Sequence, residues 1–239
     1  MLNFLGIGAQ KCATSWLYNT LSKHPNIAFP GGKEIHFWDH PGGRSVEWYK
    51  QLFSNEAYIN GDITPAYGFL PIDVIQEVYD LMPHLRLIYL IRNPIERAWS
   101  SAKMALGRAE MLHEEASDQW FIDHFNSKGS LVRGDYETCI RQWRSVFPSS
   151  QLLIMRYETI KNDPVLAANK VLNHVGLESF FEKSDDQKLI EKVFEGDGAA
   201  IRPSLIPVLQ DIYRDRIASL ERYLQEDFSN WIKSPYARK

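Results

Sequence analysis

The amino-acid sequence predicts an α/β fold with a central, mainly parallel β-sheet flanked by helices, and two observations lead to this prediction. Short apolar runs typical of buried strands alternate along the chain with segments whose apolar residues have helical spacing. Such alternation is characteristic of right-handed crossovers between parallel strands. The 239 residues contain no internal repeat, low-complexity tract or linker, so we expect one domain over residues 1–239.

The alternation defines the expected elements. The strands are Asn3–Gly8, Asn26–Phe29, Tyr58–Ile63, Leu87–Ile91 and Leu152–Arg156. The helices are Ser15–Lys23, Ser45–Leu52, Ile72–Leu81, Ile95–Leu106, Tyr136–Val146 and Pro164–Val175. The polar segment 107–134 interrupts this pattern, and we interpret it as a helical excursion bordering a cleft. A C-terminal helical segment is expected over 203–231, with an apolar stripe that packs on the core.

Composition and charge exclude several classes of protein. The net charge of −3 provides no basic field for nucleic acid, so we expect no nucleic-acid partner. No apolar run approaches the roughly 18–20 residues that cross a bilayer, and no transmembrane segment is expected. No leader pattern precedes the first strand, which favours a cytoplasmic location. The two cysteines, Cys12 and Cys139, define no disulfide framework.

The turn after the first expected strand is the most informative part of the sequence. Gly8 is followed by a loop with one lysine, Lys11, and a helix-forming run begins at Ser15. Such a turn points backbone N–H groups, the positive end of a helix dipole and a lysine at one spot, which suits a phosphate or another tetrahedral oxyanion. The expected ligands are Lys11, Cys12, Ala13, Thr14, Ser15 and Trp16, with Cys12 contributing mainly its backbone N–H.

A second basic motif follows the apolar run 87–91. Arg92 is placed at the carboxyl end of a strand, since Pro94 suits the first turn of a helix. Ser100 lies eight residues after Arg92, two turns along that helix and on nearly the same side. A guanidinium and a hydroxyl are suitable ligands for a dianionic phosphate. The alternative is a strand-end arginine that pairs with Glu96.

The two motifs together resemble those of sulfotransferases that use 3′-phosphoadenosine 5′-phosphosulfate (PAPS). The order Lys-x-x-Thr-Ser-Trp from Lys11 is similar to their 5′-phosphosulfate loop, and Arg-Asn-Pro…Ser from Arg92 is similar to the motif that holds the 3′-phosphate. The stretch Gly196–Pro203 resembles a third nucleotide loop of the family, but it lacks the Lys-Gly part, so only Arg202 carries over. The resemblance covers nearly the whole chain. It implies a P-loop-like fold, PAPS as co-substrate, adenosine 3′,5′-bisphosphate (PAP) as product and no metal requirement.

The stretch Lys33-Glu34-Ile-His36-Phe-Trp38 resembles carbohydrate sulfotransferases, including the heparan sulfate group. In those enzymes the glutamate at the position of Glu34 takes a proton from the acceptor hydroxyl. An in-line transfer needs such a base, together with cations for the phosphate leaving group and the sulfonate, roles that suit Lys11 and Lys33. His36 is left open, because a histidine is the base in related cytosolic sulfotransferases. A histidine packed under Trp38 is the equal alternative.

Acceptor binding is expected from Trp38, Asp62 and Tyr67. The segment from Asp62 to Tyr67 resembles the family's Thr-Pro-Ser/Ala-Tyr segment, which lines the acceptor cleft. Asp62 is expected to position a hydroxyl or to pair with a cleft lysine, and Trp38, Trp48 and Tyr67 suit the faces of a saccharide. The resemblance therefore favours a carbohydrate-like hydroxyl acceptor. An amine acceptor and lipid, polyketide or phenolic hydroxyls are left open.

Ala13 departs from the family pattern, because many relatives have glycine there. Alanine tolerates less backbone freedom than glycine. We therefore expect ordinary φ and ψ angles at this position of the loop.

Two other functions are weighed against sulfonate transfer. A P-loop kinase using ATP would need a Ser or Thr directly after the loop lysine and a strand-end Asp for Mg²⁺. Here Cys12 follows Lys11, and the central strand runs into Arg92. A non-catalytic adenine-nucleotide-binding module is the second alternative, and it gives no reason for the carboxylate of Glu34 beside Lys33.

Overall fold

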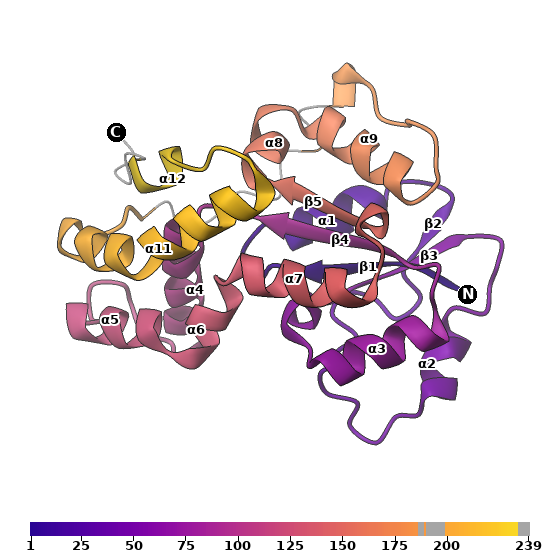
Figure 1. Ribbon diagram of the computed structural model, residues 1–239, viewed down its shortest axis with the longest axis horizontal. Coiled ribbons are helices and arrows are strands. Elements are labelled where there is room, and N and C mark those ends of the chain that lie inside the picture. Colours follow the sequence, from indigo (N-terminus) through magenta and orange to yellow (C-terminus); the bar gives the residue numbers. More distant parts are fainter. Residues whose placement is uncertain (186–188, 190–198, 234–239) are drawn as a thin grey trace. The chain divides into compact units, whose positions relative to one another are not determined.

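The computed structural model describes residues 1–185, 189 and 199–233, and Figure 1 shows its elements. The chain divides into two compact units. The first unit consists of residues 1–91 and 140–194, and the second of residues 92–139 and 195–239. The helix α7 (Tyr136–Val146) begins in the second unit and ends in the first.

The first unit is built around a five-stranded parallel sheet (Figure 1). Its strands are β1 (Leu2–Gly8), β2 (Ile27–Ala28), β3 (Ile59–Ile63), β4 (Arg86–Ile91) and β5 (Leu152–Arg156). They lie in the order β2-β3-β1-β4-β5, and each neighbouring pair is parallel. The central strands β1 and β4 are buried over most of their length, as in sheets covered on both faces. The predicted α/β fold with a mainly parallel sheet is confirmed, and each strand ends within one residue of its predicted bounds.

Helices connect the strands of the first unit. They are α1 (Thr14–Leu21), α2 (Val46–Leu52), α3 (Ile72–Leu81), α8 (Tyr157–Asn162) and α9 (Pro164–His174). Short 3₁₀ turns form at η1 (Pro65–Phe69), η2 (Ser149–Gln151) and η3 (Lys183–Asp185). Of these helices, α8 is absent from the sequence prediction. It directly follows β5 and is too short to show a helical period, with only Ile160 buried.

The described part of the second unit is helical. Its elements are α4 (Pro94–Arg108), α5 (Asp118–Asn126), α6 (Lys128–Arg133), η4 (Pro203–Leu205), α11 (Ile206–Leu224) and α12 (Asn230–Lys233). Helices α5 and α6 lie in the segment 107–134, which the sequence analysis interprets as a helical excursion. Leu209, Tyr213, Ile217 and Leu220 of α11 are buried, in keeping with the predicted apolar stripe.

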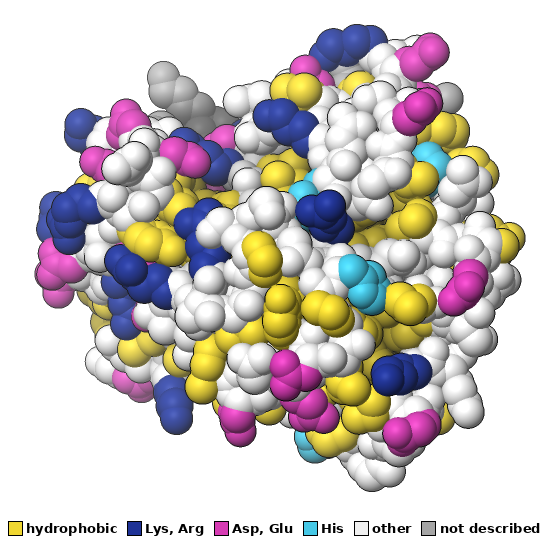
Figure 2. Space-filling model, turned by 45° about the vertical axis from the view of Figure 1, so that its right-hand side comes forward, with side chains coloured by type: hydrophobic (Ala, Val, Ile, Leu, Met, Phe, Trp, Pro, Cys, Tyr) yellow, Lys and Arg dark blue, Asp and Glu magenta, His cyan; other side chains and the backbone are white. Residues whose placement is uncertain are grey.

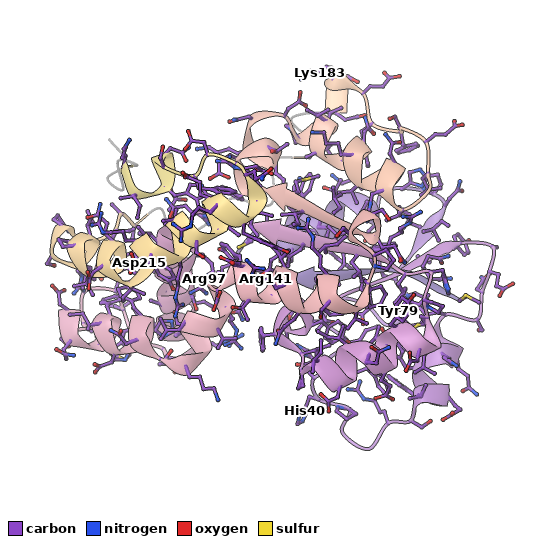
Figure 3. All side chains as sticks on the ribbon, viewed as in Figure 1. His40, Tyr79, Arg97, Arg141, Lys183 and Asp215 are labelled. Carbon is purple, nitrogen blue, oxygen red and sulfur yellow. The ribbon has the colours of Figure 1, made fainter. Side chains whose placement is uncertain are left out.

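A buried arginine joins three helices of the second unit (Figure 3). Arg97 of α4 donates from Nη2 to the carbonyl and hydroxyl oxygens of Ser130, both at 3.0 Å. The same nitrogen donates to the hydroxyl of Tyr213 at 3.3 Å. Because Ser130 lies in α6 and Tyr213 in α11, one side chain holds α4, α6 and α11 together.

Three general features of the described residues bear on function: the distribution of charge, the character of the helices and the grouping of possible metal ligands. Acidic and basic side chains are interspersed on the face shown in Figure 2, in keeping with the net charge of −3. Among residues 1–185 and 199–233, no helix combines the length and the apolar character needed to cross a membrane. The same described residues contain no group of three or more His, Cys, Asp or Glu side chains that could hold a metal ion.

Candidate active site

The loop between β1 and α1 has a backbone that alternates in handedness. Lys11 and Ala13 have φ angles of 68° and 73°, in the left-handed region, whereas Cys12 between them does not. Alternating conformations of this kind turn successive N–H groups toward a common point and form an anion-binding concavity. This alternation is compatible with the predicted phosphate loop, and the ligands named for it stay predictions.

The expectation of ordinary angles at Ala13 is wrong. Ala13 is the N-cap of α1, with φ 73° and ψ 25°. The left-handed conformation costs a residue with a Cβ roughly 1–2 kcal/mol. The physical reason for it is the tightness of the turn, because the chain leaves β1 after Gly8 and enters α1 at Thr14.

The first turn of α1 presents amide groups that no side chain of the described residues caps. The amide of Leu17 makes the first intrahelical bond, to the Ala13 carbonyl at 3.1 Å. The amides of Thr14, Ser15 and Trp16 come before that bond. Amides in this position, aided by the helix dipole, are suited to bind an anion.

Cys12 and Trp16, two of the expected phosphate ligands, are buried. The amide of Cys12 donates to the Ala9 carbonyl at 3.2 Å, so it already stabilises the turn. The expected contribution of that amide to ligand binding stays a prediction. The indole Nε1 of Trp16 has no hydrogen-bond partner among the described residues, although the side chain is fully buried.

Glu34 lies at the same edge of the sheet as the phosphate loop. Its amide donates to the carbonyl of Ile63, the last residue of β3, at 3.0 Å. Ile63 pairs with Gly6 of β1, and β1 enters the phosphate loop two residues later, after Gly8. Two stretches that are more than 20 residues apart in the sequence therefore meet at the carboxyl ends of neighbouring parallel strands.

The side chains around Glu34 alternate between basic and acidic types. The Lys33 ammonium pairs with the Glu34 carboxylate. Nε2 of His36 lies 3.7 Å from the Glu34 carboxylate, and its Nδ1 lies 2.8 Å from Oδ2 of Asp39. The His36 imidazole, which is held by Asp39, can orient the Glu34 carboxylate or exchange a proton with it.

This geometry decides between the alternatives left open for His36. The side chain of His36 is 42% exposed and faces Glu34 and Asp39. The alternative of a histidine packed under Trp38 is therefore wrong. Trp38 itself is buried, with its ring edge-on to Phe37 and to Tyr49 at centroid distances of 4.9 and 5.5 Å.

Asp62 and Tyr67 do not line an acceptor cleft, and that prediction is wrong for direct contact. Both are fully buried. The Asp62 carboxylate accepts from Thr64 Oγ1 at 2.7 Å and from the hydroxyls of Tyr49 and Tyr67 at 2.8 and 2.9 Å. Burial raises the pKa of this carboxyl above its ordinary value. Since the Tyr67 hydroxyl also accepts from the Phe37 amide at 3.0 Å, the cluster ties the Glu34 segment to the sheet.

In the second unit, Arg92 forms the ion pair that the sequence analysis gave as its alternative. Its Nε and Nη2 donate to one Glu96 oxygen at 3.0 and 2.7 Å. Asn93 caps α4 by accepting from the Ile95 amide at 3.0 Å. Ser100 lies further along α4 and is half-buried. A phosphate that binds Arg92 must therefore share the guanidinium with Glu96 or displace it.

Arg202 is held by the helical excursion of the same unit. It donates to Asp118 Oδ1 at 2.7 Å and to the His113 carbonyl at 2.6 Å, and its guanidinium lies 4.7 Å from the centre of the Phe121 ring. The hydrogen bond from Ser204 and the bond from Arg202 hold the pKa of Asp118 below its ordinary value. Residues 196–198 of the predicted third nucleotide loop lie outside the described residues.

Two side chains near Glu34, those of Asp39 and Arg44, are not among the site residues predicted from the sequence. Asp39 has a usable signal, because it follows His36 by three residues and the two groups bond directly. Arg44 has no signal of that kind, since its partners are backbone carbonyls.

A turn that leads from a strand into a helix N-terminus at the carboxyl edge of a parallel sheet is typical of α/β proteins with P-loop-like nucleotide sites. Residues 3–193 match the family described as "Sulfotransferase domain", and the chain belongs to this family. The predicted recognition of a PAPS-dependent sulfotransferase family is thus confirmed.

Similar proteins support the family and the fold. The chain is 27% identical over 176 residues to mouse heparan sulfate glucosamine 3-O-sulfotransferase 6, covering 72% of this chain and 51% of the relative. It is 25% identical to human bifunctional heparan sulfate N-deacetylase/N-sulfotransferase 2, covering 77% of this chain and 24% of the relative. The chain therefore spans about half, or less, of the length of these relatives.

Solved structures share the fold. A sulfotransferase from Alicyclobacillus acidocaldarius superposes with a TM-score of 0.74 at 24% identity, covering 97% of this chain and 98% of the other. Mouse sulfotransferase SULT7A1, solved in complex with PAP, has a TM-score of 0.62 at 15% identity, covering 94% and 88%. At these identities the likeness concerns the fold.

Proposed function

We propose that this chain transfers the sulfonate group of PAPS to the hydroxyl of a carbohydrate-like acceptor, with Glu34 as general base. The observation that carries this proposal is the pairing of β1 with β3, which brings the phosphate loop and Glu34 to one edge of the sheet. A binding module needs the anion loop alone. Only group transfer gives a reason for an exposed carboxylate beside it.

The proposed reaction is an in-line displacement at sulfur. The acceptor oxygen forms a bond to sulfur while the bond from sulfur to the phosphate oxygen of PAPS breaks, and the Glu34 carboxylate takes the acceptor proton. Lys11 and the first amides of α1 stabilise the charge that develops on the departing phosphate. Lys33 contacts the sulfonate oxygens, and the products are a sulfate ester and PAP.

Recognition of the 3′-phosphate is assigned to Arg92, Ser100 and Arg202. Arg92, which precedes α4, supplies a guanidinium, Ser100 within α4 supplies a hydroxyl, and Arg202 before η4 adds a second guanidinium. Because the Arg92 guanidinium is bound to Glu96, the proposed 3′-phosphate competes with this carboxylate for it.

The acceptor is proposed to be a saccharide, because the relatives are named for their action on heparan sulfate. Trp48 is the aromatic side chain that supports this class on geometric grounds. It is 36% exposed, whereas the other two predicted stacking residues, Trp38 and Tyr67, are buried. The predicted cytoplasmic location and the independence from metal ions stay predictions.

Binding and turnover test the proposal separately. PAP without magnesium should raise the thermal midpoint, whereas Mg-ATP should not, because binding to the folded state alone stabilises it. Labelled PAPS should then sulfate members of a panel of neutral and anionic oligosaccharides. Stabilisation by Mg-ATP alone would favour the kinase alternative. Stabilisation by PAP with no transfer to saccharide, lipid or phenolic acceptors would favour the binding module.

A further inference from the structure

Arg44 binds the backbone of the segment that carries Glu34 and His36. Its side chain donates to four carbonyl oxygens: Ile35 at 3.0 Å, His36 at 2.9 Å, His40 at 2.8 Å and Pro41 at 2.7 Å. Four N–H donors of one guanidinium are thus used on one loop. Figure 3 labels His40, which marks this loop on the ribbon.

The backbone of this loop has an unusual conformation. Glu34 and His36 have φ angles of 63° and 54°, in the left-handed region that residues with a side chain rarely adopt. A residue in such a conformation keeps it only when its surroundings fix it. From the side of the sheet, the amides of Glu34 and Phe37 are fixed by Ile63 and Tyr67. The carbonyls of Ile35 and His36 are fixed by Arg44.

The position of Arg44 is itself secured by α2. The next residue, Ser45, is the N-cap of α2 and accepts from the Trp48 amide at 3.2 Å. The guanidinium also lies 4.9 Å from the centre of the Trp48 ring. Tyr49 of the same helix stacks on Phe37 at a centroid distance of 4.6 Å and reaches Asp62 with its hydroxyl.

We propose that Arg44 is a positioning residue for sulfonate transfer: it holds the backbone that aims Glu34 and His36, without touching the substrate. An arginine suits this role because its planar fork stays protonated and offers five N–H groups in fixed directions. A lysine has three donors on a flexible stem and cannot reach four carbonyls in the same geometry. The proposal rests on the proposed function, since it assigns Arg44 to the base of that reaction.

Kinetics of two variants and a matched control test the proposal. Arg44→Ala should lower kcat by about 10- to 100-fold, because a small misplacement of a reacting group has an effect of this order. The KM for PAPS and the affinity for PAP should change less than about two-fold. Arg44→Lys should recover only part of the loss. The control is Arg86→Ala, which removes an exposed arginine that donates to one carbonyl, Ser150, and should leave kcat unchanged.

A double variant separates positioning from general damage. If Arg44 acts through Glu34, adding Arg44→Ala to Glu34→Gln should cause no further loss of kcat, because the base is already absent. A further loss equal to that in the wild-type background would overturn the proposal. Full activity of Arg44→Lys, or a loss of PAP affinity in Arg44→Ala as large as the loss of kcat, would also overturn it.

Amide exchange keeps this inference separate from the proposed function. The amides of Glu34 and Phe37 should exchange at least about ten-fold faster in Arg44→Ala than in Arg86→Ala, with the exchange of β1 and β4 amides unchanged. If the wild-type protein shows no transfer from PAPS, the proposed function fails, and this measurement still reports whether Arg44 holds the loop. Equal exchange rates in the two variants would show that it does not.

Discussion

The first and second units differ in how their predicted nucleotide-binding residues are held. In the first unit, Lys11, Ala13, Glu34 and His36 all have positive φ angles, so the predicted site is shaped by the backbone. In the described part of the second unit, Arg92 and Arg202 already have carboxylate partners, Glu96 and Asp118. A backbone conformation can shape a site without adding charge. An arginine brings a positive charge, which a nearby carboxylate neutralises when no ligand is bound. The comparison predicts that substitutions in the first unit affect catalysis and those in the second affect nucleotide affinity.

The largest effect is expected at Glu34. Glu34→Gln keeps the size and hydrogen bonding of the side chain but removes its basicity, so kcat should fall by about 10²- to 10⁴-fold. PAP affinity, measured by calorimetry, should be nearly unchanged. His36→Ala should be milder, because the imidazole acts through its contact with Glu34.

The reverse ranking would assign the base to His36. The pH dependence of kcat/KM gives an independent check, since a limb at about pH 4–5 is typical of a carboxylate base and one at about 6.5 of an imidazole. Asp39→Asn serves as the matched variant, because it removes a carboxylate beside His36 and leaves Glu34 in place.

The second-largest effect is expected at Lys11. Lys11→Ala removes a cation from the developing charge on the phosphate leaving group, and kcat should fall by about 10²-fold. The measurement is single-turnover transfer from saturating PAPS, which isolates the chemical step from binding. Lys23→Ala, which removes a lysine beyond the end of α1, is the control and should retain full activity. Full activity of Lys11→Ala would remove this residue from the mechanism.

A smaller effect, on affinity, is expected in the second unit. Arg92→Ala should weaken PAPS binding by about 10- to 150-fold, since a charged hydrogen bond contributes roughly 1.5–3 kcal/mol. Binding of adenosine 5′-phosphosulfate, which has no 3′-phosphate, should hardly change. Calorimetry with both nucleotides measures the difference, and equal losses would contradict the assignment.

Glu96→Gln is the control for Arg92. It removes the anion that competes for the guanidinium, so PAPS should bind as tightly as before or up to about five-fold more tightly, the range of a partly exposed ion pair. Weaker PAPS binding in this variant would mean that Glu96 orients Arg92 for the phosphate.

The sequence predicts the sheet well because apolar runs and helical spacing are local signals. It does not predict the burial of Asp62, since the hydroxyls that satisfy this carboxylate come from Tyr49, Thr64 and Tyr67. The role of Arg44 is also hidden, because its hydrogen bonds go to backbone carbonyls, which no residue type in the sequence signals. Motifs identify the residue types of the site, and tertiary hydrogen bonds decide which of them reach a ligand.

The smallest expected effect concerns stability. Ala13→Gly removes the left-handed cost of about 1–2 kcal/mol, offset by the roughly 0.5–1 kcal/mol that glycine loses in chain entropy. The free energy of unfolding should therefore rise by up to about 1.5 kcal/mol, which corresponds to a Tm higher by up to roughly 6 °C. Ala105→Gly, inside α4, is the matched control and should lower the free energy of unfolding by about 1 kcal/mol. Opposite signs for the two substitutions would show that the left-handed backbone at position 13 outweighs the loss of the methyl group. A lower Tm for Ala13→Gly, measured by calorimetry, would mean that the methyl group of Ala13 stabilises the loop by more than its conformation costs.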